Sequence, residues 1–463
     1  MTLPRDARVR LAPGVRVRDG GRTLVGGAPT RVSHLGAVAA DLLGDGELRA
    51  VDPRERALAD RLVDSGMALT VGSSLPEVPL DDVTCVVPVR DRPFALERLL
   101  AGLDGAVRVL VVDDGSLDPG ATRVVAERHG ADALLLPVNG GPAAARNAGL
   151  AQVTTRFVLL ADSDVVLRPD DVRDLVRHLG DPDVALVAPR VLGLEGGDGW
   201  LDRYEAVRSS LDLGPRSALV RPRSTVAWVP SAVLVGRVAA LDDGFDASMR
   251  SGEDVDLVWR LCAQGWRVRY DADVVVRHEN RVRLLPWLGR KAFYGSSAQP
   301  LAERHGRAVA PAVLTPLGLL VTVAALAQRR WSVPLVPACW LLTSLRLSRR
   351  LGRSDRPAVL AAELTARAVG SAVDQTTGLL LRHWWPLTAL ACTVSPRARR
   401  AVLASMAAQV VAERARPVPP PRGRGYWAAR RLDDLAYGAG VWAGALRARS
   451  LAALLPDVRW RRG

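Results

Sequence analysis

Lysine is almost absent from this sequence. Lys291 is the single lysine, so arginine supplies nearly all of the 63 basic residues. An arginine skew of this kind is typical of GC-rich codon usage, so the formal net charge of +14 indicates mutational bias as readily as an anionic partner. Net charge bears on solubility and association rather than on fold. We therefore expect no nucleic-acid partner from the charge alone.

Cysteine is also scarce, and a hydrophobic leader is missing. The four cysteines lie far apart in apolar surroundings: Cys85, Cys262, Cys339 and Cys392. This spacing does not fit a metal site, and we expect buried thiols in a reducing compartment. The segment from Met1 to Arg18 alternates arginine with short apolar residues, so we expect no signal peptide and a catalytic domain that faces the cytoplasm.

The remaining composition is typical of a folded protein with more than one packed unit. The chain has 463 residues, of which 48% are hydrophobic and 24% charged. This length exceeds that of one ordinary hydrophobic core. We predict a small domain at residues 1–75, an α/β domain at 80–305, and a helical, apolar region at 306–463.

Short apolar runs alternate with helical patterns in the central segment. The runs Val83 to Val89, Val107 to Val112 and Arg156 to Leu160 have the character of buried strands. Strands that alternate with helices predict a mostly parallel sheet, and such sheets bind ligands at the carboxyl ends of their strands. Each of the polar motifs considered next follows such a run or begins a helix.

The first motif is Asp162-Ser163-Asp164, directly after a predicted strand. Two carboxylates two residues apart can hold a hard divalent cation against a pyrophosphate, while one of them also reaches a ribose. The same three residues occur by chance in many surface loops. Their position at a strand end favours a function.

Two further motifs follow the preceding strands. Asp113 and Asp114 can accept hydrogen bonds from a base N–H and from ribose hydroxyls, although they could equally form a helix-capping turn. Gly141 and Arg146 belong to a glycine-rich segment that opens a helix. Exposed amides at a helix start attract phosphate. The alternative for this segment is close packing between helix and strand.

The last motifs are acidic residues at a helix start and a histidine at a strand end. Glu253 and Asp254 open a predicted helix. A carboxylate held there can remove the proton from an acceptor hydroxyl, but it could also simply cap the first turn. His278 ends a predicted strand, where a further metal ligand is needed. A lone histidine is more often structural.

In this order, the motifs between Val83 and His278 resemble family 2 glycosyltransferases. The resemblance implies a GT-A fold, a Rossmann-like and mostly parallel sheet, and an inverting transfer from a UDP-sugar that requires Mg²⁺ or Mn²⁺. Pro88, Asp91 and Asp113 would contact the base, Asp162 the ribose, and Asp164 and His278 the metal, with Asp254 as the catalytic base. Val89 would also belong to the nucleotide-sugar site. No Gln-x-x-Arg-Trp follows Glu253-Asp254, which argues against processive polysaccharide synthesis.

The N-terminal segment adds a second resemblance. A hairpin pattern around Asp19-Gly20-Gly21 and two helical patterns after it resemble a small winged-helix-like α+β domain that binds peptides. With the phrase Pro-Val-Arg-Asp-Arg-Pro at 88–93, the whole chain resembles the mycofactocin-system glycosyltransferases of actinobacteria. That family implies transfer of glucose from UDP-glucose to a peptide-derived redox cofactor precursor. The alternative is a membrane-associated family 2 enzyme with a lipid or cell-wall polysaccharide acceptor.

The C-terminal third contains long uncharged runs bracketed by arginine. The run from Ala308 to Gln328 is as long as a membrane span but contains Pro311 and Pro316. A transmembrane helix, an interfacial hairpin and a buried helix all fit this pattern. Flanking Trp331 favours interface contact. We expect membrane contact through this region, at the cytoplasmic face.

Overall fold

The computed structural model describes residues 3–194, 197, 199–280, 282–416, 420–421 and 423–459. The chain forms two compact units, one of residues 1–196 and 208–280 and the other of residues 197–207 and 281–463. The predicted boundaries near residues 75, 80 and 305 stay predictions. Each unit is described by itself below.

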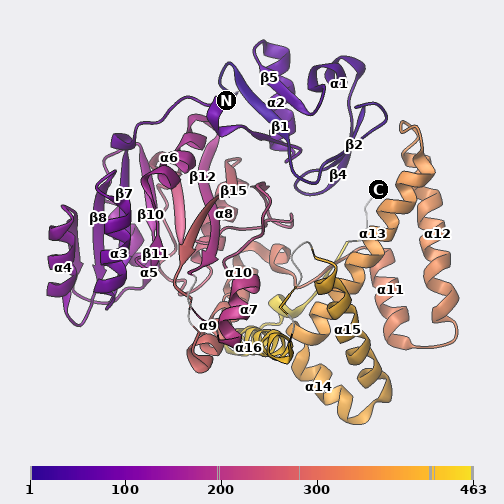
Figure 1. The fold of residues 1–463 in the computed structure, drawn as a ribbon. Helices are drawn as coiled ribbons and strands as arrows, with labels where there is room; N and C mark the ends of the chain where they lie inside the picture. The colour runs from indigo at the N-terminus through magenta and orange to yellow at the C-terminus, as the bar shows by residue number, and fades with distance from the viewer. Residues whose placement is uncertain are drawn as a thin grey trace. The chain divides into compact units, whose positions relative to one another are not determined.

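The N-terminal part of the first unit consists of two small antiparallel sheets and two helices (Figure 1). The elements are β1 (Ala7–Leu11), β2 (Arg16–Arg18), β3 (Thr23–Gly26), β4 (Arg31–His34), α1 (Ala37–Leu43), β5 (Glu47–Ala50), α2 (Pro53–Asp64) and β6 (Ala68–Thr70). The predicted hairpin is present, because β2 pairs with β3 across Asp19-Gly20-Gly21. Asp52 caps α2 in a reciprocal capping box with Glu55. The winged-helix assignment stays a prediction.

A sheet of nine described strands forms the core of the first unit. Its strands are β7 (Val83–Val89), β8 (Arg108–Asp114), β9 (Asp132–Leu136), β10 (Phe157–Ala161), β11 (Val165–Val166), β12 (Val184–Gly193), β13 (Ala218–Val220), β14 (Val233–Arg237) and β15 (Arg267–His278). The order is β11-β15-β12-β14-β10-β7-β8-β9, and β13 pairs with β15. Because β10, β7, β8 and β9 are parallel neighbours, the predicted α/β class with a mostly parallel sheet is confirmed.

Helices follow the strand ends and cover the sheet. They are α3 (Pro93–Leu103), α4 (Pro119–Arg128), α5 (Pro142–Leu150), α6 (Pro169–Arg177) and α8 (Glu253–Ala263). The first four begin at proline, whose fixed φ suits the first helical position. Gly149 of α5 faces the sheet so closely that a Cβ atom there would lie 2.3 Å from Cγ1 of Val86. The alternative interpretation of this segment, close helix–strand packing, therefore holds for its C-terminal end.

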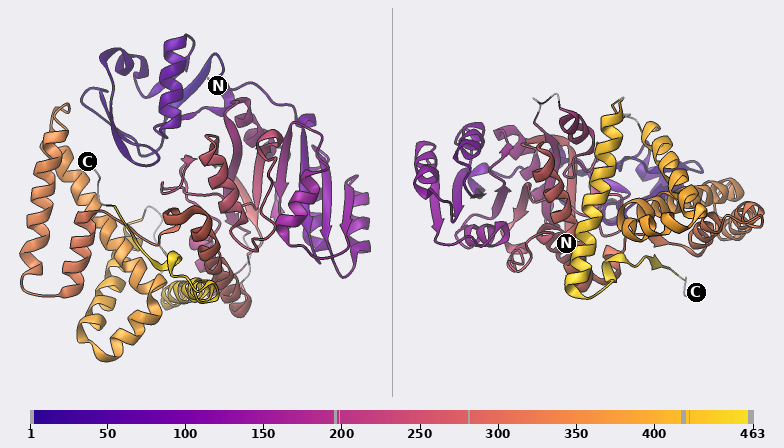
Figure 2. Two further views of the ribbon diagram at one scale, coloured as in Figure 1. Left: turned by 180° about the vertical axis from the view of Figure 1, so that it is seen from behind. Right: turned by 90° about the horizontal axis from the view of Figure 1, so that it is seen from below.

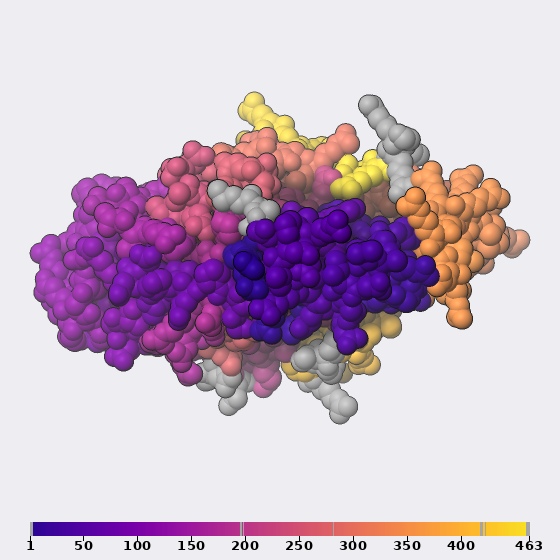
Figure 3. All heavy atoms as spheres, turned by 90° about the horizontal axis from the view of Figure 1, so that it is seen from above, coloured from indigo at the N-terminus to yellow at the C-terminus, as the bar shows by residue number. Residues whose placement is uncertain are grey.

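Arg267 joins the N-terminal part to the central sheet. Its side chain is 3% exposed, and it pairs with Asp60 at 2.9 Å, Asp64 at 2.8 Å and Asp181 at 3.0 Å. Nearby, Arg269 donates a hydrogen bond to the carbonyl of Thr70 at 2.9 Å. In the space-filling view, the N-terminal segment is the indigo part of the surface (Figure 3). The two parts of the first unit are therefore held together by buried charge.

The second unit is helical (Figure 2). Its helices are α7 (Trp200–Arg208), α9 (Leu284–Ser296), α10 (Ala298–His305), α11 (Pro316–Ala327), α12 (Ser332–Arg350), α13 (Pro357–Gly378), α14 (Trp385–Val394), α15 (Pro396–Arg414) and α16 (Arg424–Ala448), with a small parallel pair, β16 (Val313–Leu314) and β17 (Asp457–Val458). Lys291 lies inside this unit. Its ammonium is 2.8 Å from a carboxylate oxygen of Glu205 and 3.4 Å from one of Asp433, and the residue is 3% exposed.

The uncharged run at 308–328 is broken in the structure. It contains β16 and then α11, which has only 12 residues and starts at the Thr315 cap and Pro316. A helix of that length is about 18 Å long, whereas the hydrocarbon core of a bilayer is about 30 Å thick. Within the described parts of the chain, no helix combines the length and the apolar character that a membrane span requires.

We expect Arg267→Ala to lower the free energy of unfolding by about 3 to 5 kcal/mol, because it leaves the carboxylate of Asp181 buried without its partner. Urea unfolding would measure this. A suitable control is Arg108→Ala, because Arg108 also pairs with an aspartate, Asp132, but both side chains are more than half exposed. Its loss should be about 1 kcal/mol or less. Equal losses in the two variants would contradict the role of Arg267.

Candidate functional site

The sheet brings the first group of predicted site residues together at the carboxyl ends of its strands. Val89 of β7 pairs with Asp113 of β8, so these parallel strands end at the same level. Strand β10, the neighbour of β7 on the other side, ends at Ala161, directly before Asp162. Pro88 and Val89 lie at the end of β7. The carboxyl ends of three adjacent strands thus present the first group of candidate residues.

Asp91 connects the loop after β7 with the loop after β8. It has a φ of +53°, its carboxylate accepts a hydrogen bond from the amide of Leu117 at 2.7 Å, and its own amide donates to the hydroxyl of Ser116 at 2.9 Å. The loop between β7 and α3 is therefore fixed against the loop after β8. The role of Asp91 as a contact of the base stays a prediction.

Asp113 presents an unused acceptor. The residue is fully buried, and one carboxylate oxygen accepts a hydrogen bond from the amide of Ser116 at 2.7 Å. The other oxygen is buried and has no hydrogen-bond partner among the described residues. A buried acceptor without a partner costs free energy. An N–H group of a nucleobase would supply the missing donor.

Asp114 holds the glycine-rich segment. Its two carboxylate oxygens accept hydrogen bonds from the amides of Gly140, at 2.8 Å, and Gly141, at 2.9 Å. The amide of Gly141 also lies 2.9 Å from the side-chain oxygen of Asn139. These amides are therefore already used within the protein, so any phosphate contact in this segment must come from other donors. In this structure, the contact between Asp114 and Gly141 anchors the glycine-rich segment to the end of β8.

Arg146 connects Asp162, directly after β10, with Glu253, at the start of α8. Its side chain is 3% exposed, and it pairs with Asp162 at 2.5 Å and with Glu253 at 3.3 Å. The guanidinium also lies over the ring of Phe245, 5.4 Å from its centre. Burial raises the pKa of Asp162, and this guanidinium opposes the rise. The sequence motif predicted an arginine that meets phosphate, whereas the structure buries it between two carboxylates.

Strand pairing brings Asp164 and His278 together. Val165 of β11 pairs with His278 of β15, and Nε2 of this histidine lies 3.3 Å from one carboxylate oxygen of Asp164. The other oxygen of Asp164 lies 2.5 Å from the guanidinium of Arg92. Burial alone would raise the pKa of Asp164, but the hydrogen bond from His278 and the two positive charges lower it to about 2. Asp164 is therefore ionised at neutral pH.

These residues fit a divalent cation that is completed by a substrate. In the described ranges, no group of three or more His, Cys, Asp or Glu side chains is arranged to hold a metal by itself. Mg²⁺ in enzymes commonly binds one or two carboxylates and takes its remaining ligands from substrate phosphates and water. Asp164 and His278 provide one oxygen and one nitrogen that face each other. Ser163, between the two aspartates, is buried.

Glu253 and Asp254 form a buried acidic pair at the first turn of α8. Gly252 precedes them with a φ of +80°. Asp254 accepts hydrogen bonds from the amides of Val255 at 2.8 Å and Ser231 at 3.3 Å. Burial and the charge of Asp254 raise the pKa of Glu253 to about 7, and burial also raises the pKa of Asp254. Glu253 can therefore exchange a proton near neutral pH, and the raised pKa makes the carboxylate of Asp254 a stronger base than an exposed aspartate, as general-base catalysis requires.

Three further residues of this region had no role assigned to them from the sequence. Arg92 contacts Asp164, Phe245 supports Arg146, and Asn147 exchanges two hydrogen bonds with the backbone of Phe245, at 2.7 and 2.8 Å. The signal was present, because Arg92 belongs to the Pro-Val-Arg-Asp-Arg-Pro phrase and Asn147 follows Arg146 directly. Only the folded chain shows which carboxylate each of them contacts.

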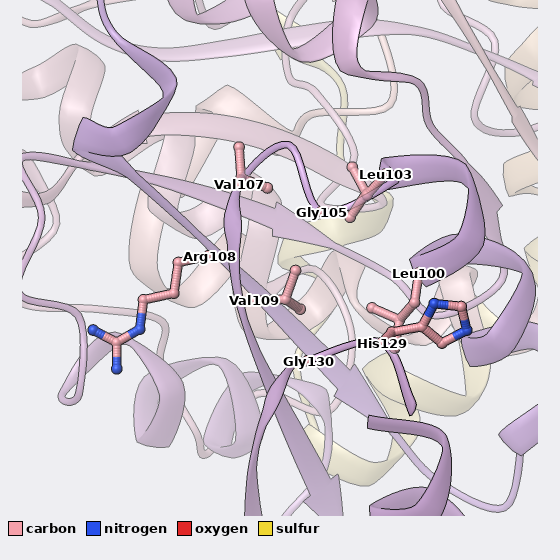
Figure 4. A pocket seen from close by; sticks show the side chains of 8 residues that line it. All are labelled: Leu100, Leu103, Gly105, Val107, Arg108, Val109, His129 and Gly130. Carbon is pink, nitrogen blue, oxygen red and sulfur yellow. The ribbon is translucent and has the colours of Figure 1, made fainter. Parts of the chain in front are cut away.

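A small cavity lies elsewhere on the sheet. Its volume is about 210 Å³, and it is lined by residues such as Leu103, Val107 and His129 (Figure 4). Arg108, at the start of β8, is another lining residue, whereas Asp113 and Asp114 lie at the opposite end of that strand. The cavity is therefore separate from the candidate site.

The sequence of this chain matches a known family of enzymes. Residues 84–235 match the model of glycosyl transferase family 2. The chain is 41% identical over 474 aligned residues to a pre-mycofactocin glycosyltransferase of Mycobacterium tuberculosis (strain CDC 1551 / Oshkosh), with 99% of each chain covered. A solved mannosyltransferase from Pyrobaculum calidifontis, in complex with GDP-Man and Mn²⁺, is similar at 17% identity and a TM-score of 0.43, covering 81% of this chain and 91% of that one. A glucosyl-3-phosphoglycerate synthase from M. tuberculosis, in complex with Mn²⁺, UDP-glucose and phosphoglyceric acid, has 23% identity and a TM-score of 0.36, with coverages of 48% and 79%.

We expect Arg146→Lys to lower the free energy of unfolding by about 3 kcal/mol, because a lysine cannot serve two carboxylates with one planar fork and leaves one of them buried and unpaired. Urea unfolding would measure the loss. Arg156→Lys is a matched control, since Arg156 also pairs with an aspartate and lies over a phenylalanine ring, yet its side chain is 70% exposed. If both variants lose the same stability, Arg146 does not have the proposed connecting role.

Proposed function

Because the chain belongs to the pre-mycofactocin glycosyltransferases of glycosyl transferase family 2, we propose that it transfers glucose, with inversion, from UDP-glucose. The acceptor in this proposal is a peptide-derived redox cofactor precursor of the mycofactocin pathway. The relationship extends over 99% of the chain and so includes both regions that flank the catalytic segment. This breadth favours the cofactor pathway over a lipid or cell-wall polysaccharide acceptor.

The observation that carries the proposal is the shared arginine between two carboxylates. Arg146 contacts Asp162, two residues before the metal-site Asp164, and Glu253, the neighbour of Asp254. A donor held at the strand ends and a base held at the start of α8 are thereby kept at a fixed separation. Positioning of this kind is a large part of catalysis by transferases.

The residues assign a role to each part of the reaction. In the proposed step, an acceptor hydroxyl oxygen forms a bond to the anomeric carbon of glucose, and its proton passes to Asp254. The bond from that carbon to the diphosphate oxygen breaks on the opposite face, and UDP leaves with the electron pair. A divalent cation, when bound, neutralises charge on the diphosphate. Asp113 would accept the N–H of the base through its unused oxygen.

We expect Asp254→Asn to abolish transfer while UDP binding persists, because the amide cannot take a proton. The measurement is UDP released by purified protein with Mn²⁺, the precursor as acceptor, and UDP-glucose or other UDP-sugars as donors. For the unaltered enzyme, the rate should fall as the solution is acidified, because burial raises the pKa of Asp254 and a protonated carboxyl group cannot take the proton of the acceptor.

Asp243→Asn is the control for this experiment, since Asp243 lies near the same helix but its side chain is 75% exposed. It should retain full activity. Full activity of Asp254→Asn would remove the base assignment, and a rate that does not change with pH would contradict the proposed protonation. Release of UDP only from a UDP-sugar other than UDP-glucose would show that UDP-glucose is not the donor.

We further infer that the enzyme works at the cytoplasmic face of the membrane, bound through α12 rather than by a membrane span. Leu341, Leu342 and Leu345 are exposed on this helix, and at about 100° per residue they lie on one side of it. Arg346, Arg349 and Arg350 follow in its last turns. An apolar helix face with adjacent arginines suits the surface of an anionic bilayer.

Sedimentation with vesicles tests this localisation. We expect the protein to sediment with phosphatidylglycerol vesicles and to remain in solution with phosphatidylcholine vesicles. The double variant Leu341→Asp with Leu342→Asp should lose the binding, whereas Leu446→Asp, on α16, removes an equally exposed leucine and should keep it. Equal sedimentation of all three proteins would show that α12 is not the contact.

A further inference from the structure

Arg92 contacts the carboxylate of Asp164, one of the two residues assigned to the metal. Its guanidinium is 2.5 Å from one oxygen of Asp164, and the other oxygen of that carboxylate faces His278. Both oxygens are thus engaged, one by a guanidinium and one by an imidazole. A divalent cation that binds between Asp164 and His278 would meet the positive charge of Arg92 directly beside it.

The backbone of this arginine is fixed, but its side chain is not enclosed. Asp91 is anchored by hydrogen bonds to Ser116 and Leu117, and Pro93 begins α3 on the other side. The side chain of Arg92 remains 34% exposed, twice the exposed fraction of Asp164. A long side chain on a fixed backbone can exchange one anionic partner for another without a change in the fold.

The neighbouring arginines do not take this position. Arg90 lies 3.5 Å from Oδ2 of Asp91, the carboxylate oxygen that does not accept the amide of Leu117. Arg98 pairs with Glu279 at 2.9 Å. Among the described residues, Arg92 is therefore the arginine that contacts the metal-site carboxylate. Its planar group also suits phosphate, which it can bind through two parallel hydrogen bonds.

We propose that Arg92 is the internal counter-ion of Asp164 in the donor-free enzyme, and that it moves to the donor diphosphate when a divalent cation takes its place. This inference rests on the proposed use of a nucleotide-sugar and adds a specific residue to it. Without the diphosphate, the cation and Arg92 compete for one carboxylate and repel each other. With the diphosphate, both positive groups have an anionic partner.

The consequence is cooperative binding of metal and nucleotide. Each ligand strengthens the binding of the other by the same factor, because coupling between two sites is reciprocal. The metal site is weak until UDP or a UDP-sugar is present. A simple structural ion pair between Arg92 and Asp164 would add nothing to this coupling.

The test measures Mn²⁺ affinity by the electron paramagnetic resonance signal of free Mn²⁺, with and without saturating UDP. For Arg92→Gln we expect Mn²⁺ to bind about tenfold more tightly in the absence of UDP, because the competing charge is gone. We also expect the strengthening of Mn²⁺ binding by UDP to be about tenfold smaller than in the unaltered protein. Arg92→Lys retains the charge and should keep Mn²⁺ binding weak without UDP.

Arg98→Gln is the matched control, because it removes an arginine of the same helix that pairs with Glu279, next to His278. Its coupling should equal that of the unaltered protein. Thermal unfolding of each variant confirms that it is folded. An Arg92→Gln protein that binds Mn²⁺ no more tightly than the unaltered protein without UDP, or that keeps the full coupling, would overturn the inference.

Failure of the proposed function gives a different result. In that case the unaltered protein itself shows no Mn²⁺-dependent binding of UDP. If the unaltered protein binds both ligands cooperatively and Arg92→Gln behaves identically, the transferase proposal stands and only the role of Arg92 fails.

Discussion

The site depends on one buried guanidinium shared by two carboxylates. Arg146 lies between Asp162 and Glu253, which come from elements far apart in the sequence. Burying a charged group costs free energy, and the opposite charge offsets this cost. Removal of one member of the group would therefore leave the others buried without compensation, which is strongly destabilising. The separation between the donor residues at the strand ends and the base at the start of α8 is set by this contact. The hydrogen bonds of Asn147 to the backbone of Phe245 hold the aromatic ring that Arg146 packs against.

Much of the central domain could be predicted from local sequence. The apolar runs at β7, β8 and β10 are buried strands, and the D-x-D motif follows the last of them, because parallel strands covered on both faces require nearly continuous apolar sequence. The contact between Asp164 and His278 depends on the antiparallel pairing of β11 with β15, and β11 has only two residues. So short a strand has no recognisable pattern in the sequence. His278 was singled out because it ends a predicted strand, but nothing in the local sequence placed it beside Asp164.

The side-chain partners of the arginines were beyond local prediction. Arg146 was expected to face phosphate, yet it is buried between the carboxylates of Asp162 and Glu253, which come from other parts of the chain. Arg267, which had no motif around it, connects residues of α2 with the central sheet. In the C-terminal third, composition left a membrane span, an interfacial hairpin and a buried helix open, whereas in the structure Thr315 and Pro316 start a short helix in the middle of the uncharged run. Composition reports apolar content but not where a helix begins.

The rarity of lysine acquires a chemical meaning once Lys291 is located. The one ammonium side chain of the protein is enclosed between Glu205 and Asp433 and lies over the ring of Trp287. Arginine does not react with the acylating and reductively alkylating reagents that modify primary amines. The surface therefore offers no lysine to such reagents or to lysine-modifying enzymes, and the folded enzyme could be treated with activated esters without alteration of its arginine-lined site.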